Sequence, residues 1–507
     1  NGIPPGYTHD PTSFPAGAVL TLNNLVALPR NASALLFDGR DRIASTKAIV
    51  VSRAAWATTP GTVLASSVEV PATVDYGTRF VAPVGQDVSA NGMFQYAGLF
   101  VMAGQDGTSV TIDTDGSGPS SPVTVVLNRG ESYQVNGGIL KGATVTATKP
   151  VQVDLATGKI GANYESRWFR LYPTEQWYSS YITPVGTSAN GNPAYVYLFS
   201  TNTAPLTVSY QTQTGSGTLT IPGTNGICQF QVPANSGARF TSAGSVPFYA
   251  LSTVGANPTA NQVYDWGFTL VPADDLTTVA VVGWGPGSND GTQNGSPIWV
   301  TPTAATRVYV DYNGDGLGAL TDPQGHKYDA AYDLAALQSA RVYDPDKDQT
   351  AMRLYTLDGT PIAAVWGEDP AVAGSGNPYL DMGTTIIPFP TPVITKTSVI
   401  ATDNTPTGLS TNDILRYTIT VNNKGLLALG DVVVIDELPT NSLLYITGST
   451  LFYADGGTTN STVVADHTSG TPFPLGSPEG YTIPVIPRGS SSRFTFLARI
   501  IGSGSIV

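Results

Sequence analysis

The chain has 507 residues, which is too long for one ordinary domain and indicates several. Only 12% of the residues are charged while 41% are hydrophobic, so the composition excludes a disordered chain and favours strands and turns. A net charge of −13 without clusters of Lys or Arg excludes a surface that tracks nucleic-acid phosphates. No apolar run is long enough to span a bilayer, and the single cysteine, Cys228, excludes an internal disulfide.

Residues 1–70 are expected to form an N-terminal arm and a partial β unit. The first ten residues are rich in Pro and Gly and are suited to reach a neighbouring molecule. Alternatively, residues 17–25 form a strand that fills the open sheet edge of a neighbour. Both readings predict contacts between copies of the chain.

A unit of about 100 residues then repeats along the chain. Its landmark is a proline that follows a short, mainly apolar stretch, at Pro71, Pro173, Pro272 and Pro388. Tyr76 and Phe80 of the first copy correspond to Trp177 and Tyr181 of the second, each 101 residues later. Three units are therefore expected, with the boundaries 71–172, 173–271 and 272–387.

Within a unit, short stretches such as Thr218–Ile221 alternate polar and apolar residues, and Gly, Asn or Pro interrupts them every 8 to 12 residues or so. This pattern predicts an all-β fold of tandem β-sandwich-like units. A closed, propeller-like ring is the alternative, although about 100 residues is long for a blade of about 45. One Ala- and Leu-rich stretch, residues 330–340, is instead expected to form a short helix.

A Pro-rich linker at 388–393 precedes a last segment, residues 394–507. Residues 415–421 alternate apolar and polar side chains, which indicates a strand with one buried face, and Asn422–Gly425 is a hairpin signal. The segment resembles the Ig-like "conserved repeat" domain of bacterial and archaeal surface proteins, through Asp413–Gly425, Gly430–Pro439 and Leu444–Ser449. The resemblance implies an Ig-like β-sandwich on a surface stalk. The family's closing strand is not seen before Val507, so the sandwich is expected either to be cut short or to take its closing strand from elsewhere.

The run from Pro173 to Pro184, with Trp177 and Tyr181 inside it, and the strand that begins Lys149–Pro150 form a second recognisable pattern. Through them the region of about 71–390 resembles the N-terminal domain of IgG Fc-binding-protein-like sequences. This resemblance implies an extracellular architecture rather than chemistry. Antibody binding is not carried over, because the cysteine-rich modules of the mammalian namesake are missing here.

The strongest site candidate is a loop that fits the calcium pattern D-x-[DN]-x-[DN]-G-x5-E with Asp in the final place. Alternate residues of such a loop direct oxygens at one point, the central Gly allows the turn, and the twelfth residue closes the shell. The expected ligands are Asp311, Asn313, Asp315, the carbonyl of Leu317, and Asp322. A strand at 307–310 leads into the loop, so the loop does not belong to a helix–loop–helix EF-hand.

A second acidic cluster either completes the same site or forms another, through Asp344, Asp346 and Asp348. Three carboxylates so close together repel one another unless they are solvated or bridged by a cation. Calcium is therefore the expected cofactor. The alternative interpretation is a plain Asn/Asp/Gly turn with solvated acids.

The chain is expected not to be an enzyme. Its three histidines are far apart in sequence, and neither a G-x-S-x-G elbow nor an H-E-x-x-H zinc motif occurs. The aromatic cluster around Trp177 and Tyr181 is suited to stacking on sugars but is expected to serve packing in the core or between units. Lys396 raises the hypothesis of an isopeptide bond to a late Asn beside Asp436 or Glu437, although no matching Asn is visible.

These patterns predict a non-enzymatic, extracellular structural protein, a mature secreted chain without a signal peptide. It is expected to assemble with copies of itself into a filament, sheath or surface layer that calcium stabilises. The alternative is a monomeric stalked adhesin, or a surface protein that binds a glycan or another cell-surface ligand. Neither reading involves nucleic acid or a membrane span in this chain.

Overall fold

A computed structural model describes the chain at residues 15–21, 43–45, 47–55, 66–88, 92–116, 118–160, 166–255, 266–287, 296–372, 382–424 and 428–502. These residues form strands and short 3₁₀ turns and no α-helix, which confirms the all-β prediction. Nothing in this part of the chain has the length and apolarity of a membrane-crossing helix. The chain divides into a larger compact unit, which ends at Pro388, and a smaller one that contains residues 389–507 together with 44–49.

The first repeat is organised around β8, a strand of 15 residues that pairs with β3, β4, β5 and β9 along different parts of its length. The sheet runs in the order β6-β5-β8-β4-β7, and β6 also lies close to β7, so the sheet is a nearly closed barrel. Its strands are β3 (Gly77–Val81), β4 (Tyr96–Ala103), β5 (Thr108–Asp113), β6 (Val123–Leu127), β7 (Ser132–Val135), β8 (Thr144–Gly158) and β9 (Ser166–Arg170).

The second repeat is a sandwich of two antiparallel sheets, ordered β13-β12-β15-β10-β18 and β14-β11-β16-β17. Buried and exposed residues alternate along strands such as β12, as the polar–apolar pattern predicted. The strands are β10 (Ser180–Thr183), β11 (Ala194–Ser200), β12 (Leu206–Thr212), β13 (Ser216–Ile221), β14 (Gly226–Gln231), β15 (Ala238–Ser242), β16 (Tyr249–Val254), β17 (Trp266–Thr269) and β18 (Val271–Pro272).

The third repeat is again a sandwich of two sheets, ordered β19-β26-β21-β24 and β25-β20-β27-β28. The helix expected at residues 330–340 is wrong, because residues 330–334 form a strand and Ala340 begins the next one. Ala330, Tyr332 and Leu334 alternate on the core side of the first strand, which pairs with β21. The strands are β19 (Val279–Val281), β20 (Ile298–Pro302), β21 (Thr306–Asp311), β22 (Leu320–Thr321), β23 (Lys327–Tyr328), β24 (Ala330–Leu334), β25 (Ala340–Val342), β26 (Arg353–Tyr355), β27 (Ile362–Gly367) and β28 (Gly383–Thr385).

The strands that precede the four landmark prolines lie together at the centre of the larger unit. They are β2 (Ser66–Glu69), which pairs with β1 (Ser52–Ala55), and then β9, β17 and β28. β2 lies beside β9, β9 beside β17, β17 beside β28, and β28 beside β2, so the four strands close a circuit. The second and third repeats are thus sandwiches, as expected, and all the repeats are arranged around one closed centre.

The landmark prolines themselves begin a recurring local turn. A 3₁₀ turn follows each of the first three, as η1 (Thr73–Asp75), η2 (Thr174–Gln176) and η4 (Ala273–Asp275), while η3 (Ala243–Ser245) lies elsewhere in the second repeat. Trp177, which closes the second of these turns, is 7% exposed, and its ring lies 6.0 Å from that of Phe199 and 5.5 Å from that of Tyr249. The packing role expected for this tryptophan is confirmed.

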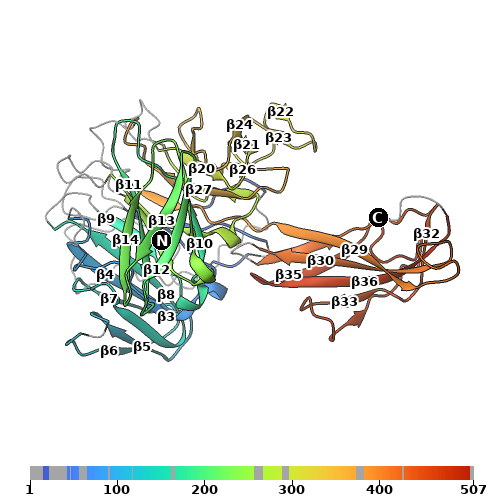
Figure 1. The fold of residues 1–507 in the computed structure, drawn as a ribbon, viewed down its shortest axis with the longest axis horizontal. Coiled ribbons are helices and arrows are strands. Elements are labelled where there is room, and N and C mark those ends of the chain that lie inside the picture. Colours follow the sequence, from blue (N-terminus) through green and yellow to red (C-terminus); the bar gives the residue numbers. More distant parts are fainter. Residues whose placement is uncertain are drawn as a thin grey trace. The chain divides into compact units, whose positions relative to one another are not determined.

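The smaller unit is a β-sandwich whose main sheet runs β29-β30-β36-β33-β34, with a second sheet of β31 and β35 (Figure 1, orange to red). The hairpin signal at Asn422–Gly425 is wrong, since β30 pairs with β29 and β36 while β31 pairs with β35, and Gly425 itself lies outside the described residues. The strands are β29 (Pro392–Thr402), β30 (Ile414–Asn423), β31 (Leu429–Val434), β32 (Leu443–Tyr445), β33 (Leu451–Tyr453), β34 (Thr462–Val463), β35 (Tyr481–Ile486) and β36 (Ser491–Ile500).

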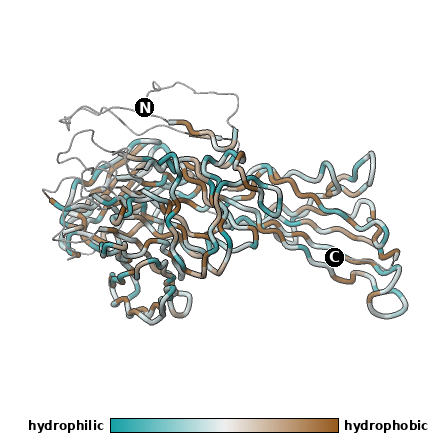
Figure 2. Tube along the Cα trace, turned by 90° about the horizontal axis from the view of Figure 1, so that it is seen from above, coloured by the Kyte–Doolittle hydropathy of each residue, from teal (hydrophilic) through white to brown (hydrophobic). Residues whose placement is uncertain are grey.

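Each unit has a hydrophobic interior of its own. In the smaller one, alternate residues of β30, including Leu415, Tyr417 and Ile419, are buried with Phe494 of β36. Figure 2 shows hydrophobic and hydrophilic residues interspersed along the strands of both units, as expected for sheets with one buried face. Lys396 donates a hydrogen bond to Asp436 Oδ1 at 2.7 Å, so the structure contains an ion pair at the place considered for an isopeptide bond.

Candidate functional site

The turn that follows β21 contains the first three predicted calcium ligands. Asp311 ends the strand and is only 1% exposed, while Asn313 and Asp315 are exposed beyond it. Asp311 Oδ2 accepts a hydrogen bond from the Gly316 amide at 2.9 Å. Gly316 has a φ of +70°, the left-handed conformation for which the pattern requires glycine. The glycine of the motif therefore has the backbone conformation that the pattern requires.

The Asp311 carboxyl group lies in an unfavourable electrostatic environment. Burial, and then the negative charges of Asp315 and Asp329, raise its pKa, while the Gly316 amide and Arg353 act in the opposite direction. Its Oδ1 is buried and has no hydrogen-bond partner among the residues that the structure describes. This oxygen therefore lacks the partner that a buried carboxylate usually has.

Asp322, the predicted twelfth ligand, is held in a turn of its own. Its Oδ1 accepts the amides of Gln324 at 2.8 Å and His326 at 2.9 Å, and its Oδ2 accepts the Tyr355 hydroxyl at 3.0 Å. The His326 ring lies 2.9 Å from the same Oδ2. Burial opposes ionisation, but these contacts lower the pKa of Asp322 to about 2. Leu317, the predicted carbonyl ligand, is 80% exposed.

The second acidic cluster forms a ladder of side chain to backbone hydrogen bonds. The amides of Asp346, Asp348 and Thr350 donate to Asp344, Asp346 and Asp348 respectively, at 3.0, 2.8 and 3.0 Å. Burial first, and then the nearby negative charges of Asp346 and Asp329, raise the pKa of Asp344 to about 6. Asp329 is thus close enough to both clusters to raise the pKa of Asp311 in the first and of Asp344 in the second.

The tertiary structure brings both clusters to one cavity of about 580 Å³. Asn313 and Asp315 of the first turn and Asp348 of the second line it, together with residues 16–19 and 21 of the N-terminal segment. No three Asp, Glu, His or Cys side chains of the described residues are arranged around a common point as metal ligands, so calcium stays a prediction. The sequence contained no signal for the N-terminal part of this site.

In the corresponding turn of the first repeat, backbone amides donate hydrogen bonds to both acidic side chains. Asp113 Oδ1 accepts the amides of Asp115 at 3.3 Å and Gly116 at 3.2 Å. Asp115 accepts the amides of Gly118 and Ser120, both at 2.9 Å, through its two oxygens. The unpaired carboxylate oxygen of Asp311 is therefore not a general property of this turn.

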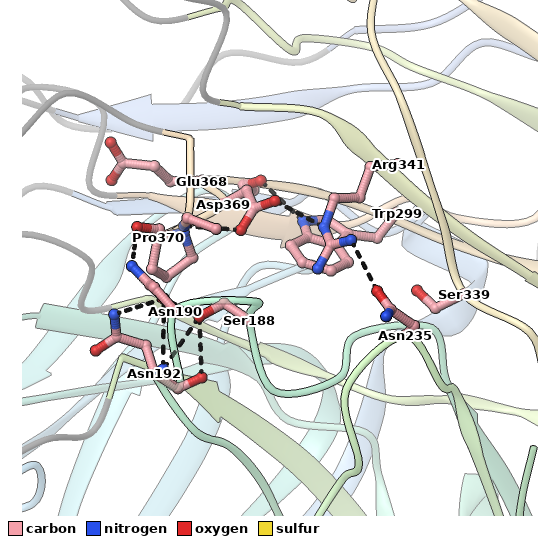
Figure 3. A network of polar contacts seen from close by, with 12 residues as sticks. Ser188, Asn190, Asn192, Asn235, Trp299, Ser339, Arg341, Glu368, Asp369 and Pro370 are labelled. Atoms are coloured by element: carbon pink, nitrogen blue, oxygen red, sulfur yellow. Dashed lines mark hydrogen bonds and ion pairs between the residues drawn. The ribbon is translucent and has the colours of Figure 1, made fainter. Parts of the chain in front are cut away.

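A polar network that the sequence did not reveal joins the second and third repeats (Figure 3). The Arg341 guanidinium forms an ion pair with Asp369 at 2.7 Å, donates to Asn235 Oδ1 at 3.2 Å and lies 4.5 Å from the centre of the Trp299 ring. Asp369 is 1% exposed, so its charge is paired in the interior. The network holds a junction together, because its members come from distant parts of both repeats.

The family described as IgGFc binding protein matches residues 65–367, which is more than half of the chain. The chain belongs to this family. The IgGFc binding protein region begins just before β2 and ends with β27, so it includes both acidic turns and most of the network in Figure 3. The resemblance stated for the repeat region is confirmed over this range, and that of the C-terminal segment stays a prediction. No curated protein matches the chain.

Proposed function

We propose that this chain is a non-enzymatic, extracellular protein that serves as a subunit of a cell-surface assembly, such as a filament, sheath or surface layer. Calcium at the acidic turns of the third repeat stabilises the subunit. Membership of the IgGFc binding protein family supports a role in binding at the surface rather than in catalysis. The resemblance of the C-terminal segment to surface-stalk domains agrees with this location.

The observation that carries the proposal is the closed circuit of β2, β9, β17 and β28. Each repeat packs its inner strand against that of the next repeat. The repeats therefore form one packed body rather than separate domains joined by linkers. The junction network around Arg341 and Asp369 adds a buried ion pair to the same body. A rigid body of this kind suits a structural subunit better than a flexible binding arm.

The edge of the smaller unit supports contact with further copies. β29 is 11 residues long and pairs only with β30 among the described strands. Its apolar side chains are exposed, with Ile394 at 54% and Val399 at 58%. A long, apolar edge strand is a ready template for a strand from another molecule. The occupant proposed for this edge is a second copy of the chain.

Light scattering and electron microscopy of the same sample, in millimolar calcium and then in excess chelator, test the assembly. We expect wild-type protein to form calcium-dependent polymers or sheets, and Val399→Lys to reduce their mass at least severalfold because the charge blocks the edge. Val74→Lys is the matched control, since Val74 is 69% exposed and lies in a 3₁₀ turn. A wild-type protein that stays monodisperse and monomeric in both buffers contradicts the proposal.

A monomeric surface protein that binds a ligand is the second candidate, favoured by membership of a family described as a binding protein. Surface plasmon resonance with IgG Fc as the probe, and a glycan array in parallel, examines it. Saturable binding by monodisperse protein supports the adhesin or receptor reading. Polymers without binding to either probe support the structural reading instead.

A further inference from the structure

The fold leaves one carboxylate oxygen of Asp311 buried and without a hydrogen-bond partner among the described residues. Its Oδ2 accepts the Gly316 amide at 2.9 Å, which turns the carboxyl group into the loop. Its Oδ1 has no hydrogen-bond partner in the described part of the chain, although the residue is 1% exposed. Burying a charged oxygen without a partner is unfavourable, so the site is incomplete as it stands.

Further negative charge lies around the same carboxyl group. Asp315 and Asp329 act on it from the turn and from the segment before β24, and the positive charge of Arg353 opposes them. Asp329 is fixed in place because its Oδ2 accepts the Tyr312 amide at 2.9 Å. A cation between these groups would both pair Asp311 Oδ1 and remove the repulsion.

The N-terminal segment, residues 15–21, packs against the same turn through Gly17. Gly17 has a φ of +77°, and a Cβ at this position would lie 2.6 Å from the Asn313 carbonyl oxygen. On the other side of the turn, a Cβ at Gly314 would lie 2.4 Å from the Ala351 carbonyl oxygen. The turn is therefore packed between the N-terminal segment and the residues that follow the second acidic cluster. A shift of the Asn313 carbonyl would therefore alter the space that Gly17 occupies.

We propose that one divalent cation, bound by Asp311, Asn313 and Asp315, clamps the N-terminal segment onto the third repeat. The cation holds the turn in the conformation on which Gly17 rests, and its loss releases residues 15–21. This inference rests on the calcium binding stated in the proposed function, and adds to it what the cation controls. The N-terminal segment then becomes available to other molecules only when calcium is low.

The chemistry of the site favours calcium over other cations. All the candidate donors are oxygens, from two carboxylates, one amide and the surrounding backbone, and hard oxygen donors select calcium or magnesium over zinc or copper. Asn313 and Asp315 are exposed on a turn, so they can adapt to the irregular shell that calcium accepts and magnesium does not. Asp329 contributes negative charge without being required as a direct ligand.

Binding is measured by isothermal titration of the full chain with calcium chloride. We expect Asp315→Asn, an exposed position whose replacement spares the fold, to raise the Kd roughly tenfold or more, because one charged ligand is lost. Asp311→Asn should do the same. Asp322→Asn should leave the Kd nearly unchanged, since its oxygens are engaged by His326 and Tyr355. Asp113→Asn in the first repeat is the matched control.

Release of the segment is measured separately, by electron paramagnetic resonance of a nitroxide on Val19→Cys in a Cys228→Ala background. Val19 is 48% exposed, so it accepts the label without disturbing the packing of Gly17. We expect an immobilised spectrum in calcium and a mobile one in chelator. Gly17→Val should give the mobile spectrum even in calcium, because its side chain collides with the Asn313 carbonyl. The Kd for calcium should rise as well, because the coupling between the cation and the docked segment is reciprocal.

The two measurements separate the two proposals. Calcium binding with a spectrum that is unchanged by chelator overturns the clamp and leaves the calcium site in place. No heat of binding in the wild-type protein overturns the clamp and the calcium part of the proposed function together. Binding that Asp315→Asn abolishes, accompanied by loss of the immobilised spectrum, supports the clamp.

Discussion

Glu69 at the end of β2 is a buried carboxyl group at the centre of the larger unit. It is 4% exposed, and its Oε1 accepts the Ser52 hydroxyl at 2.8 Å. Burial raises its pKa from 4.5 to about 8, against the smaller effects of Ser52 and Arg170. Between these two values the folded protein holds a proton that the unfolded chain has released. The stability of the larger unit therefore falls as the pH rises from about 4.5 to about 8.

Glu69→Gln should remove this pH dependence, because the amide is neutral at every pH. We expect the variant to be more stable than the wild type at pH 8, by on the order of 1–3 kcal/mol, and to differ little at pH 4.5. Thermal unfolding at both pH values measures the difference. Glu175→Gln, at an exposed position of the same unit, is the control. Parallel pH profiles for wild type and Glu69→Gln would show that Glu69 is ionised in the folded state.

At the scale of elements, the inner strands interlock through aromatic rings that rest on glycines. A Cβ at Gly267 of β17 would lie 2.8 Å from the Phe169 ring of β9. A Cβ at Gly383 of β28 would lie 2.0 Å from the Trp266 ring of β17. Trp266 is fully buried, and its indole donates to the Glu368 carbonyl at 3.0 Å, so it has no room to move aside. Each contact joins one repeat to the next.

Gly383→Ala should destabilise the larger unit by about 1–3 kcal/mol, because the new methyl group forces Trp266 or the strand to shift. Chemical denaturation followed by tryptophan fluorescence gives the change in unfolding free energy. Gly215→Ala serves as the matched control, since no atom lies within 4 Å of a Cβ built there. Equal stabilities of the two variants would argue against the interlocking contact.

The elements also show where local patterns predict structure and where they fail. The alternation at residues 415–421 correctly indicated a strand with one buried face, because period-two burial is encoded in neighbouring residues. Residues 330–340 have helix-forming side chains, yet residues 330–334 pair with β21 and Ala340 begins a strand that pairs with β20. The hairpin signal at Asn422 fails in the same way, because Asn422 lies in β30, whose partners are β29 and β36 rather than β31. Local propensity is overridden wherever a distant partner strand is available.

At the scale of the whole molecule, the chain consists of two compact units with separate hydrophobic interiors. The repeats of the larger unit share their inner strands, whereas the smaller unit buries its own residues around β30 and β36. Cores that do not share residues unfold as separate cooperative units. The repeats, in contrast, are expected to unfold together.

Differential scanning calorimetry should therefore resolve two transitions. Trp266→Ala should lower the midpoint of one and Phe494→Ala that of the other, each by the equivalent of about 3–5 kcal/mol, because both side chains are fully buried. Each variant is the control for the other. A single transition that both substitutions shift would contradict the independence of the two cores.

The sequence by itself determined the all-β class, the period of the repeat and the identity of the acidic turns. These properties depend on prolines, glycines and alternating side chains that act over a few residues. Tertiary structure alone decided that β2, β9, β17 and β28 close a circuit, and that Asp322 is captured by His326 and Tyr355. It also decided that residues 15–21 rest on the turn after Asp311, some 300 positions away in the chain. Contacts over such distances depend on how whole sheets pack, and no local pattern of side chains specifies them.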